Sequence, residues 1–280
     1  MIGPLPDLSS LETDPKGCCA RLYESDAVHW LLDDQLHPGG DRLTRRLAEL
    51  AGVERGRRVL DVACGSGATA LLLARELECD VVGVDLGSRA IEHAADAART
   101  AGLQSRARFV LGDAEALPFP DAGFDVALSE CSLCTFPDKR RAIAEMARVV
   151  APGGMIAISD VTADLTALPA PLRTAAARVA CIADARSADE YASLLRDAGC
   201  EPLAIEPHDV ELAAMADRVE ARLRVARMLA APGQQRDRVV EALSLARLAI
   251  DSIAQGTLGY ALVVARRLDH LSRTWSASRA

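Results

Sequence analysis

The stretch Arg57-Arg58-Val59-Leu60-Asp61-Val62-Ala63-Cys64-Gly65-Ser66-Gly67-Ala68-Thr69 decides the fold of this 280-residue chain. A short apolar run leads directly into a glycine-rich turn, and apolar residues at helical spacing begin immediately after it. Glycines let the backbone approach a ligand, and the first turn of a helix offers unpaired N–H groups and a partial positive charge. The segment therefore predicts a strand, a turn and a helix around a cofactor. Its G-x-G-x-x-A spacing fits a dinucleotide or another adenosine-bearing ligand.

Apolar runs and helical patterns alternate along the rest of the chain. Further strands are expected over 80–85, 107–114, 124–131 and 155–160, with helices over 88–101, where Ser88 would be the cap, and 139–150. We interpret these as five successive βα units, which predict a doubly wound parallel sheet with right-handed crossovers. Additional strands over 201–205 and 256–266 make the expected fold a seven-stranded, mostly parallel, Rossmann-like α/β sheet.

The pattern divides the chain into a core and two helical additions. Residues 1–40 are expected to form a leader and flap, residues 41–206 with 256–268 the cofactor-binding core, and residues 207–255 a helical cap inserted before the last strand. Carboxyl ends of parallel strands meet at one edge, where ligands bind. We therefore expect Gly65, Asp85, Asp113 and the pair Glu130-Cys131 to converge there. Asp85 ends the second strand, eighteen positions after Gly67, where a carboxylate holds a ribose diol.

Composition narrows the class of protein. Half of the residues are hydrophobic and only 3% are aromatic, so Ala, Val, Leu and Ile must build the core. A net charge of −8 argues against nucleic acid as a partner, and no apolar run approaches membrane-spanning length. The start of the chain lacks a basic, apolar targeting pattern, which favours a cytoplasmic protein with free thiols. Clustered cysteines are then candidate ligands or nucleophiles.

The chain resembles the class I S-adenosylmethionine-dependent methyltransferases over most of residues 55–206. The resemblance rests on four segments, VLDVACGSG (Val59–Gly67), VVGVDLG (Val81–Gly87), GDAEALPFPDAGFDVALS (Gly112–Ser129) and RVVAPGG (Arg148–Gly154). It implies S-adenosylmethionine as the cofactor. It also implies the residues that would bind this cofactor: Asp61 near the methionyl ammonium, Gly65 and Gly67 along the methionine, Asp85 at the ribose, Asp113 and Ala114 at the adenine, and their neighbours Ala63 and Leu86.

Within that superfamily the chain is most similar to the arsenite methyltransferases. The segments that carry this similarity are Ser129-Glu130-Cys131-Ser132-Leu133 with Pro137-Asp138-Lys139, the Ala157–Val161 strand end, and Cys181 ahead of 187–199. The resemblance implies that trivalent arsenic is held by Cys131, Cys181 and either Cys18 or Cys19, with a thiol reductant as partner. Soft metalloids prefer thiolates, and a lone pair on arsenic would attack the methyl group without a general base.

Other interpretations of the same residues stay open. The acceptor could instead be a small organic O, N or C nucleophile, with Glu130 or His208 as general base and the cysteines lining a pocket. Glu130 could also hydrogen-bond the cofactor, and Tyr23 in the flap could close over it. Cys134 could join Cys131, whereas Cys64, Cys79 and Cys200 are expected to be buried small hydrophobes. A cofactor-binding protein without turnover is the non-enzymatic alternative.

Overall fold

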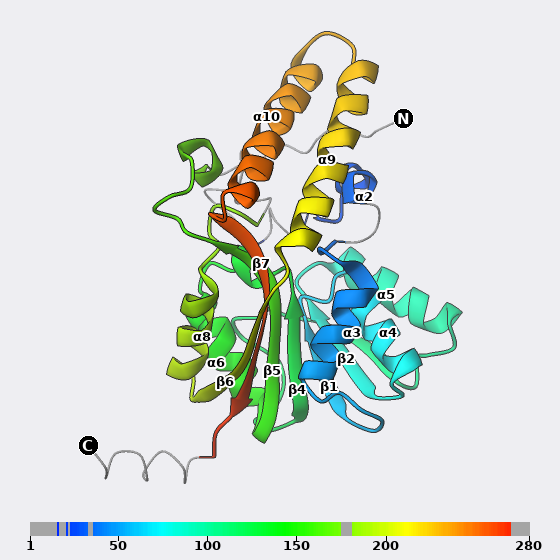
Figure 1. Cartoon of the computed structure of the whole chain (residues 1–280). Helices are drawn as coiled ribbons and strands as arrows, with labels where there is room; N and C mark the ends of the chain where they lie inside the picture. The colour runs from blue at the N-terminus through cyan, green and yellow to red at the C-terminus, as the bar shows by residue number, and fades with distance from the viewer. Residues whose placement is uncertain (1–15, 17–20, 22, 33–35, 175–180, 270–280) are drawn as a thin grey trace, which may run out of the picture.

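A single twisted sheet forms the centre of the protein (Figure 1). The computed structural model describes residues 16, 21, 23–32, 36–174 and 181–269. Seven strands lie in the order β3-β2-β1-β4-β5-β7-β6. Their bounds are β1 Arg58–Val62, β2 Asp80–Asp85, β3 Ala107–Leu111, β4 Phe124–Glu130, β5 Val150–Ala163, β6 Cys200–Pro207 and β7 Leu258–Arg267.

Strand direction confirms the mostly parallel sheet that the sequence predicts. The first five strands pair in parallel, whereas β7 runs antiparallel to both β5 and β6. Among the described residues, eight α-helices accompany the strands: α2 Asp26–Leu32, α3 Gly40–Leu50, α4 Ala68–Glu76, α5 Ser88–Thr100, α6 Lys139–Val149, α8 Ala188–Asp197, α9 Asp209–Leu229 and α10 Gln234–Ala254. Two short 3-10 helices are η1 Leu133–Thr135 and η2 Ala170–Arg173. This is the fold of class I methyltransferases.

Three details differ from the sequence prediction. The connection from β3 to β4, residues 112–123, contains no helix, so it is not a βα unit. Strand β5 begins at Val150, and Pro152-Gly153-Gly154 lies inside it at a shift in register between the β4 and β5 pairs. Helix α5 has Gly87 rather than Ser88 at its N-cap, and no side-chain cap from that residue. Glu24 instead accepts a hydrogen bond from the Ala90 amide in its first turn.

The core lies on both faces of the sheet. One buried cluster combines apolar residues of β1 and β5 with α3 and α4, and a second packs α6 and α8 against the opposite face. Most of these side chains are Ala, Val, Leu and Ile, as expected for a parallel sheet between helices. The two described helices that precede β1 have different partners, because α2 packs on α9 whereas α3 packs on α4 and β5.

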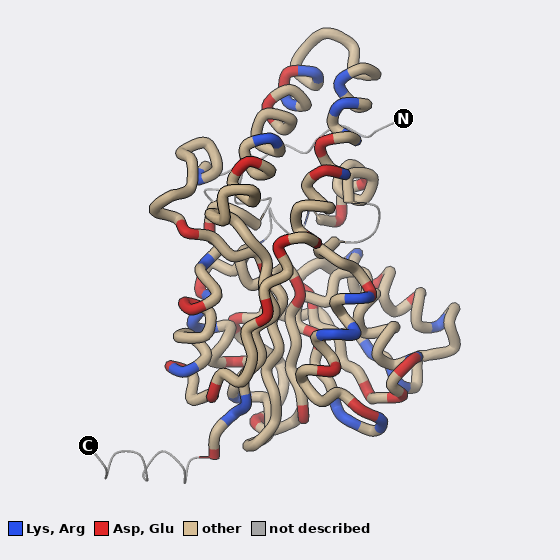
Figure 2. Tube along the Cα trace, in the orientation of Figure 1, with Lys and Arg blue, Asp and Glu red and all other residues tan. Residues whose placement is uncertain are grey.

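Helices α9 and α10 form a hairpin that stands beyond the carboxyl ends of the parallel strands (Figure 1). Leu223, Ala226, Val239 and Leu243 form its own small core, against which Trp30 and Leu31 of α2 pack. Acidic and basic residues are interspersed along both helices (Figure 2). Among the described residues, no helix is both long and apolar enough to cross a membrane.

Candidate active site

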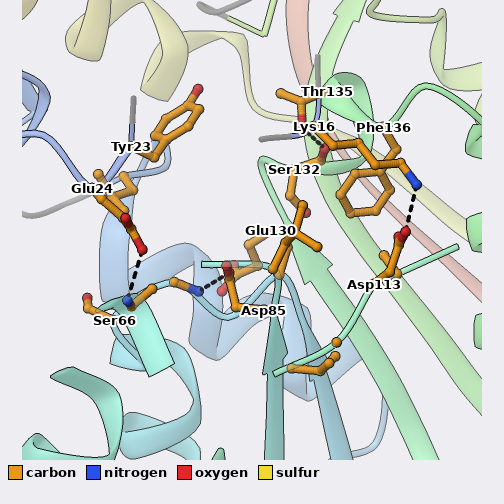
Figure 3. Close-up of a pocket in the computed structure, with 18 of the residues that line it drawn as sticks. Lys16, Tyr23, Glu24, Ser66, Asp85, Asp113, Glu130, Ser132, Thr135 and Phe136 are labelled. Atoms are coloured by element: carbon orange, nitrogen blue, oxygen red, sulfur yellow. Dashed lines mark hydrogen bonds and ion pairs between the residues drawn. The ribbon is translucent and has the colours of Figure 1, made fainter. Parts of the chain in front are cut away.

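A cavity opens at the carboxyl ends of β1, β2, β3 and β4, where the alternation of strands and helices predicts it (Figure 3). Eight of the ten residues expected to bind the cofactor line it, namely Tyr23, Ala63, Gly65, Asp85, Leu86, Asp113, Ala114 and Glu130. In the close-up, Asp85 and Glu130 lie between Tyr23 and Glu24 on one side and Lys16 and Asp113 on the other (Figure 3). The convergence expected from the strand ends is therefore present for these carboxylates.

Asp85 is fixed by two backbone amides. Its Oδ2 accepts a 2.8 Å hydrogen bond from Gly65 N in the glycine-rich turn, and its Oδ1 accepts a 2.8 Å bond from Gly87 N. Burial raises the pKa of this carboxyl, and the two amides oppose that rise. Each oxygen keeps a further lone pair, so the carboxylate can still accept hydrogen bonds from a ligand diol.

Asp61 and Gly67 do not line the cavity. Asp61 is 2% exposed, and its Oδ2 has no hydrogen-bond partner among the described residues. Burial, followed by the charges of Glu130 and Asp85, raises the pKa of Asp61. Gly67 has a φ of 82°, and a Cβ placed on it would lie 2.7 Å from Phe109 Cζ. Its absent side chain therefore lets α4 begin close to β3, rather than making room for a ligand.

Glu130 receives hydrogen bonds from three hydroxyl groups on three different elements. Thr69 of α4 donates at 2.6 Å, Thr44 of α3 at 3.1 Å and Ser159 of β5 at 3.4 Å. His37 Nε2 lies 3.9 Å from Glu130 Oε2. These donors orient the Glu130 carboxylate at the wall of the cavity. Sequence analysis identified Glu130 but not these partners, because an isolated threonine in a helix carries no motif.

The segment before α3 also reaches the cavity. Lys16 Nζ lies 2.8 Å from Asp113 Oδ2 and 2.6 Å from Glu115 Oε2. Burial alone would raise the pKa of Asp113, but the Lys16 ammonium and the Glu115 amide lower it overall. Glu24 and Tyr23 line the opposite side. Lys16 and Glu24 were not among the residues expected from the sequence.

Three thiols lie beside the cavity rather than in its lining. Cys131 Sγ and Cys181 Sγ are 3.9 Å apart, and Tyr23 Oη lies 3.1 Å from Cys181 Sγ. Cys134 is buried next to them, and its backbone amide donates a 3.0 Å hydrogen bond to Asp160. Cys18 and Cys19 lie outside the described residues, so the structure does not place the expected third ligand. Among the described residues, no group of three or more His, Cys, Asp or Glu side chains is arranged to hold a metal ion.

The thiols of this cluster differ in acidity. Hydrogen bonds from the Cys131 and Cys134 thiols, with one from Tyr23, lower the pKa of Cys181 well below its usual value. The interaction with Cys181, together with burial, raises the pKa of Cys131. Burial raises the pKa of Cys134. Cys181 is therefore the most acidic thiol of the three.

His208, one of the two bases considered from the sequence, does not line the cavity. It lies between β6 and α9, where its ring nitrogens face Glu206 at 3.7 Å and Glu211 at 3.5 Å. Glu130 is consequently the candidate base that the structure brings to the cavity.

Comparison with known proteins decides the family. Residues 53–199, more than half of the chain, match the family described as "Methyltransferase domain". The chain belongs to this methyltransferase family. This chain is 36% identical over 193 residues to 27-O-demethylrifamycin SV methyltransferase of Amycolatopsis mediterranei. The match covers 66% of this chain and 70% of the relative. It is also 32% identical over 231 residues to the O-methyltransferase cnsE of Penicillium expansum, covering 82% and 79% of the two chains.

A solved structure shares nearly the whole fold of this methyltransferase. The [4+2]-cyclase SpnF superimposes with a TM-score of 0.72 at 25% identity, covering 95% of this chain and 98% of that one. Neither curated relative is an arsenite methyltransferase by name. The comparisons therefore support the expected cofactor, S-adenosylmethionine, and a methyltransferase activity, but they do not support arsenite as the substrate.

The residues around the cavity fit S-adenosylmethionine. Its sulfonium and ammonium groups are cationic, and Asp61, Asp85 and Glu130 place three carboxylates at this end of the sheet. The buried Oδ2 of Asp61 has no hydrogen-bond partner in the part of the chain that the structure describes. When bound, this cofactor supplies an electrophilic methyl group. The protein supplies charge, orientation and exclusion of water around it.

Proposed function

We propose that this methyltransferase transfers a methyl group from S-adenosylmethionine to a hydroxyl oxygen of a small organic acceptor, with Glu130 as the general base. The observation that carries the proposal is the Glu130 carboxylate, which lines the cavity and is held by Thr69, Thr44 and Ser159. The names of the two relatives that match over 70% and 79% of their length, both O-methyltransferases, support a hydroxyl acceptor.

We further propose roles for the cofactor-binding residues. Asp85 would accept the ribose hydroxyls, because its two oxygens are oriented by the Gly65 and Gly87 amides and keep free lone pairs. Asp113 and Ala114 would flank the adenine, and Gly65 would lie along the methionine. Asp61, which lies behind the cavity wall, would act on the ammonium through its charge rather than through direct contact.

Glu130 suits a hydroxyl acceptor for a chemical reason. An oxygen nucleophile must lose its proton as it is methylated, and a positioned carboxylate can accept that proton. The hydroxyls of Thr69 and Thr44 keep the carboxylate oriented at the cavity that it lines. Removing a general base of this kind lowers turnover by about 10²- to 10⁴-fold.

The experiment is a methyl-transfer assay with radiolabelled S-adenosylmethionine and a panel of hydroxylated acceptors that includes simple phenols, catechols and hydroquinones. We expect labelled product from the wild type and loss of at least about a hundredfold in kcat for Glu130→Gln. S-adenosylhomocysteine binding, measured by calorimetry, should change little in this variant. Full activity in Glu130→Gln, or methylation of only amine and carbon acceptors, would overturn the proposal.

A second candidate function rests on the 3.9 Å separation of the Cys131 and Cys181 sulfur atoms. Two thiols this close, with Cys134 beside them, could hold trivalent arsenic, and Cys18 or Cys19 would remain candidates for a further ligand. The same assay with arsenite and a thiol reductant separates the two functions. Methylated arsenic that disappears in Cys131→Ser and Cys181→Ser would favour arsenite, whereas retention of phenol methylation in both variants would favour the organic acceptor.

A further inference from the structure

His37 connects the buried carboxylate of Glu130 to the edge of the protein. Its Nδ1 lies 3.2 Å from the carbonyl oxygen of Pro38, which can only accept a hydrogen bond. In a neutral ring, Nδ1 therefore carries the proton, and the lone pair of Nε2 is left facing the cavity wall. That lone pair points at Thr44 Oγ1, 3.5 Å away, and at Glu130 Oε2, 3.9 Å away.

The hydroxyl of Thr44 lies between the imidazole and the carboxylate. It is 3.3 Å from Glu130 Oε1 and 3.1 Å from Oε2, and it is only 3% exposed. A hydroxyl group can donate one hydrogen bond while accepting another. Thr44 can therefore accept a proton from one neighbour as it releases its own to the other. The His37 side chain is 15% exposed, so the chain of groups ends near solvent.

We propose that Thr44 and His37 are positioning residues that act through Glu130 and carry the acceptor's proton away from the cavity. This inference rests on the proposed function. The acceptor oxygen forms its bond to the methyl carbon while the methyl–sulfur bond breaks and leaves its electron pair on sulfur. The acceptor's proton goes to Glu130, which donates to Thr44 Oγ1 as the Thr44 hydroxyl proton moves to His37 Nε2. Water then takes the proton from His37.

The surroundings of Glu130 explain why the protein needs a path that carries the proton away from this carboxylate. The charges of Glu130 and Asp85 both act on the buried Asp61. A general base that has taken a proton from one acceptor must release it before it can serve the next. The path through Thr44 leads to His37, whose side chain is partly exposed.

The first test is nitrogen NMR of histidine-labelled protein with S-adenosylhomocysteine bound. We expect His37 to be in the tautomer with hydrogen on Nδ1, and its Nε2 resonance to move in Thr44→Val and Glu130→Gln but not in Thr44→Ser. The resonances of His208 serve as an internal control in every spectrum. A His37 ring with hydrogen on Nε2 would overturn the inference. So would an Nε2 resonance that stays at the same position in both Thr44→Val and Glu130→Gln.

The second test uses phenol as the methyl acceptor. We expect His37→Ala to lower kcat about tenfold with an unchanged KM for S-adenosylmethionine, and added imidazole to restore turnover. His208→Gln, which removes an imidazole outside the cavity, should keep the wild-type kcat. Full turnover in His37→Ala would disprove the relay. If the wild type methylates neither phenol nor the other hydroxylated probes, the proposed function fails, and the NMR test alone then decides whether the three groups are linked.

Discussion

Thr69 donates a 2.6 Å hydrogen bond to Glu130 and thereby joins the first turn of α4 to the end of β4. The glycine-rich turn that precedes α4 is thus linked directly to the candidate base.

Replacing Thr69 with Val should lower turnover with the hydroxylated acceptor. The substitution keeps the side-chain shape but removes a donor to a charged group, which is worth about 1.5–3 kcal/mol and corresponds to about ten- to a hundredfold in kcat. Thr69→Ser restores the hydroxyl and should recover most of the activity. Equal activity in both variants would show that Glu130 does not need this donor.

Gly67→Ala should destabilise the fold more than a glycine substitution in open space. Both Gly67, with φ 82°, and Gly56, with φ 78°, are left-handed, but only at Gly67 would a Cβ meet Phe109 and Ala94 within 3 Å. We expect Gly56→Ala to cost about 1–2 kcal/mol and Gly67→Ala at least about 1 kcal/mol more, measured by urea unfolding. Phe109→Leu should recover part of the loss in Gly67→Ala.

Asp85→Asn should weaken cofactor binding. An amide group can present only one oxygen, so its NH₂ group would face the Gly65 or Gly87 amide that now donates to the carboxylate. We expect the Kd for S-adenosylhomocysteine to rise about tenfold or more in calorimetry. Asp80→Asn, at the exposed start of the same strand, is the matched control and should bind normally. Similar affinities for the two variants would argue against a cofactor role for Asp85.

Asp160 should make stability depend on pH. Burial raises its pKa to about 7, with the charge of Cys181 as a further cause. Because the folded-state pKa lies above the unfolded-state value of 3.8, the folded state binds more protons between these pH values. The free energy of unfolding should therefore fall as pH rises from about 4 to about 7, by as much as about 4 kcal/mol from this group.

Asp160→Asn tests this dependence, because the neutral side chain cannot titrate. Its unfolding free energy should change less between pH 5 and pH 8 than that of the wild type, although the lost acceptor lowers its absolute stability. Asp217→Asn, on the exposed face of α9, should keep the wild-type slope. A slope in Asp160→Asn equal to that of the wild type would assign the pH dependence to other groups.

Local patterns explain why much of the fold was predictable. The apolar strand before Gly65 and the helix after Gly67 are specified by adjacent residues, and the same holds for Asp85 at the end of β2. The convergence of Asp85, Asp113 and Glu130 then follows from the parallel sheet. The strand that includes Pro152 could not be derived from the same rules, because the pairing of Val150 with Phe124 overrides the local turn preference there.

The partners of the site residues were harder to predict than the residues themselves. Thr44 and His37 approach Glu130 only because α3 packs beside α4 and β5, a choice that no short pattern encodes. Cys131 and Cys181 were expected near the cavity mouth, and the structure brings their sulfur atoms together. Their role as ligands of trivalent arsenic stays a prediction.

The α9 and α10 hairpin leaves the sheet at the end of β6 and returns to it at the start of β7, and these two strands are antiparallel neighbours. Both ends of the hairpin are thus attached to neighbouring strands of the same sheet. Its length and sequence can diverge without disturbing strand register or the cofactor half of the cavity. The hairpin can therefore vary between related proteins while the strand ends that line the cavity are kept, because β6 and β7 hold both of its ends.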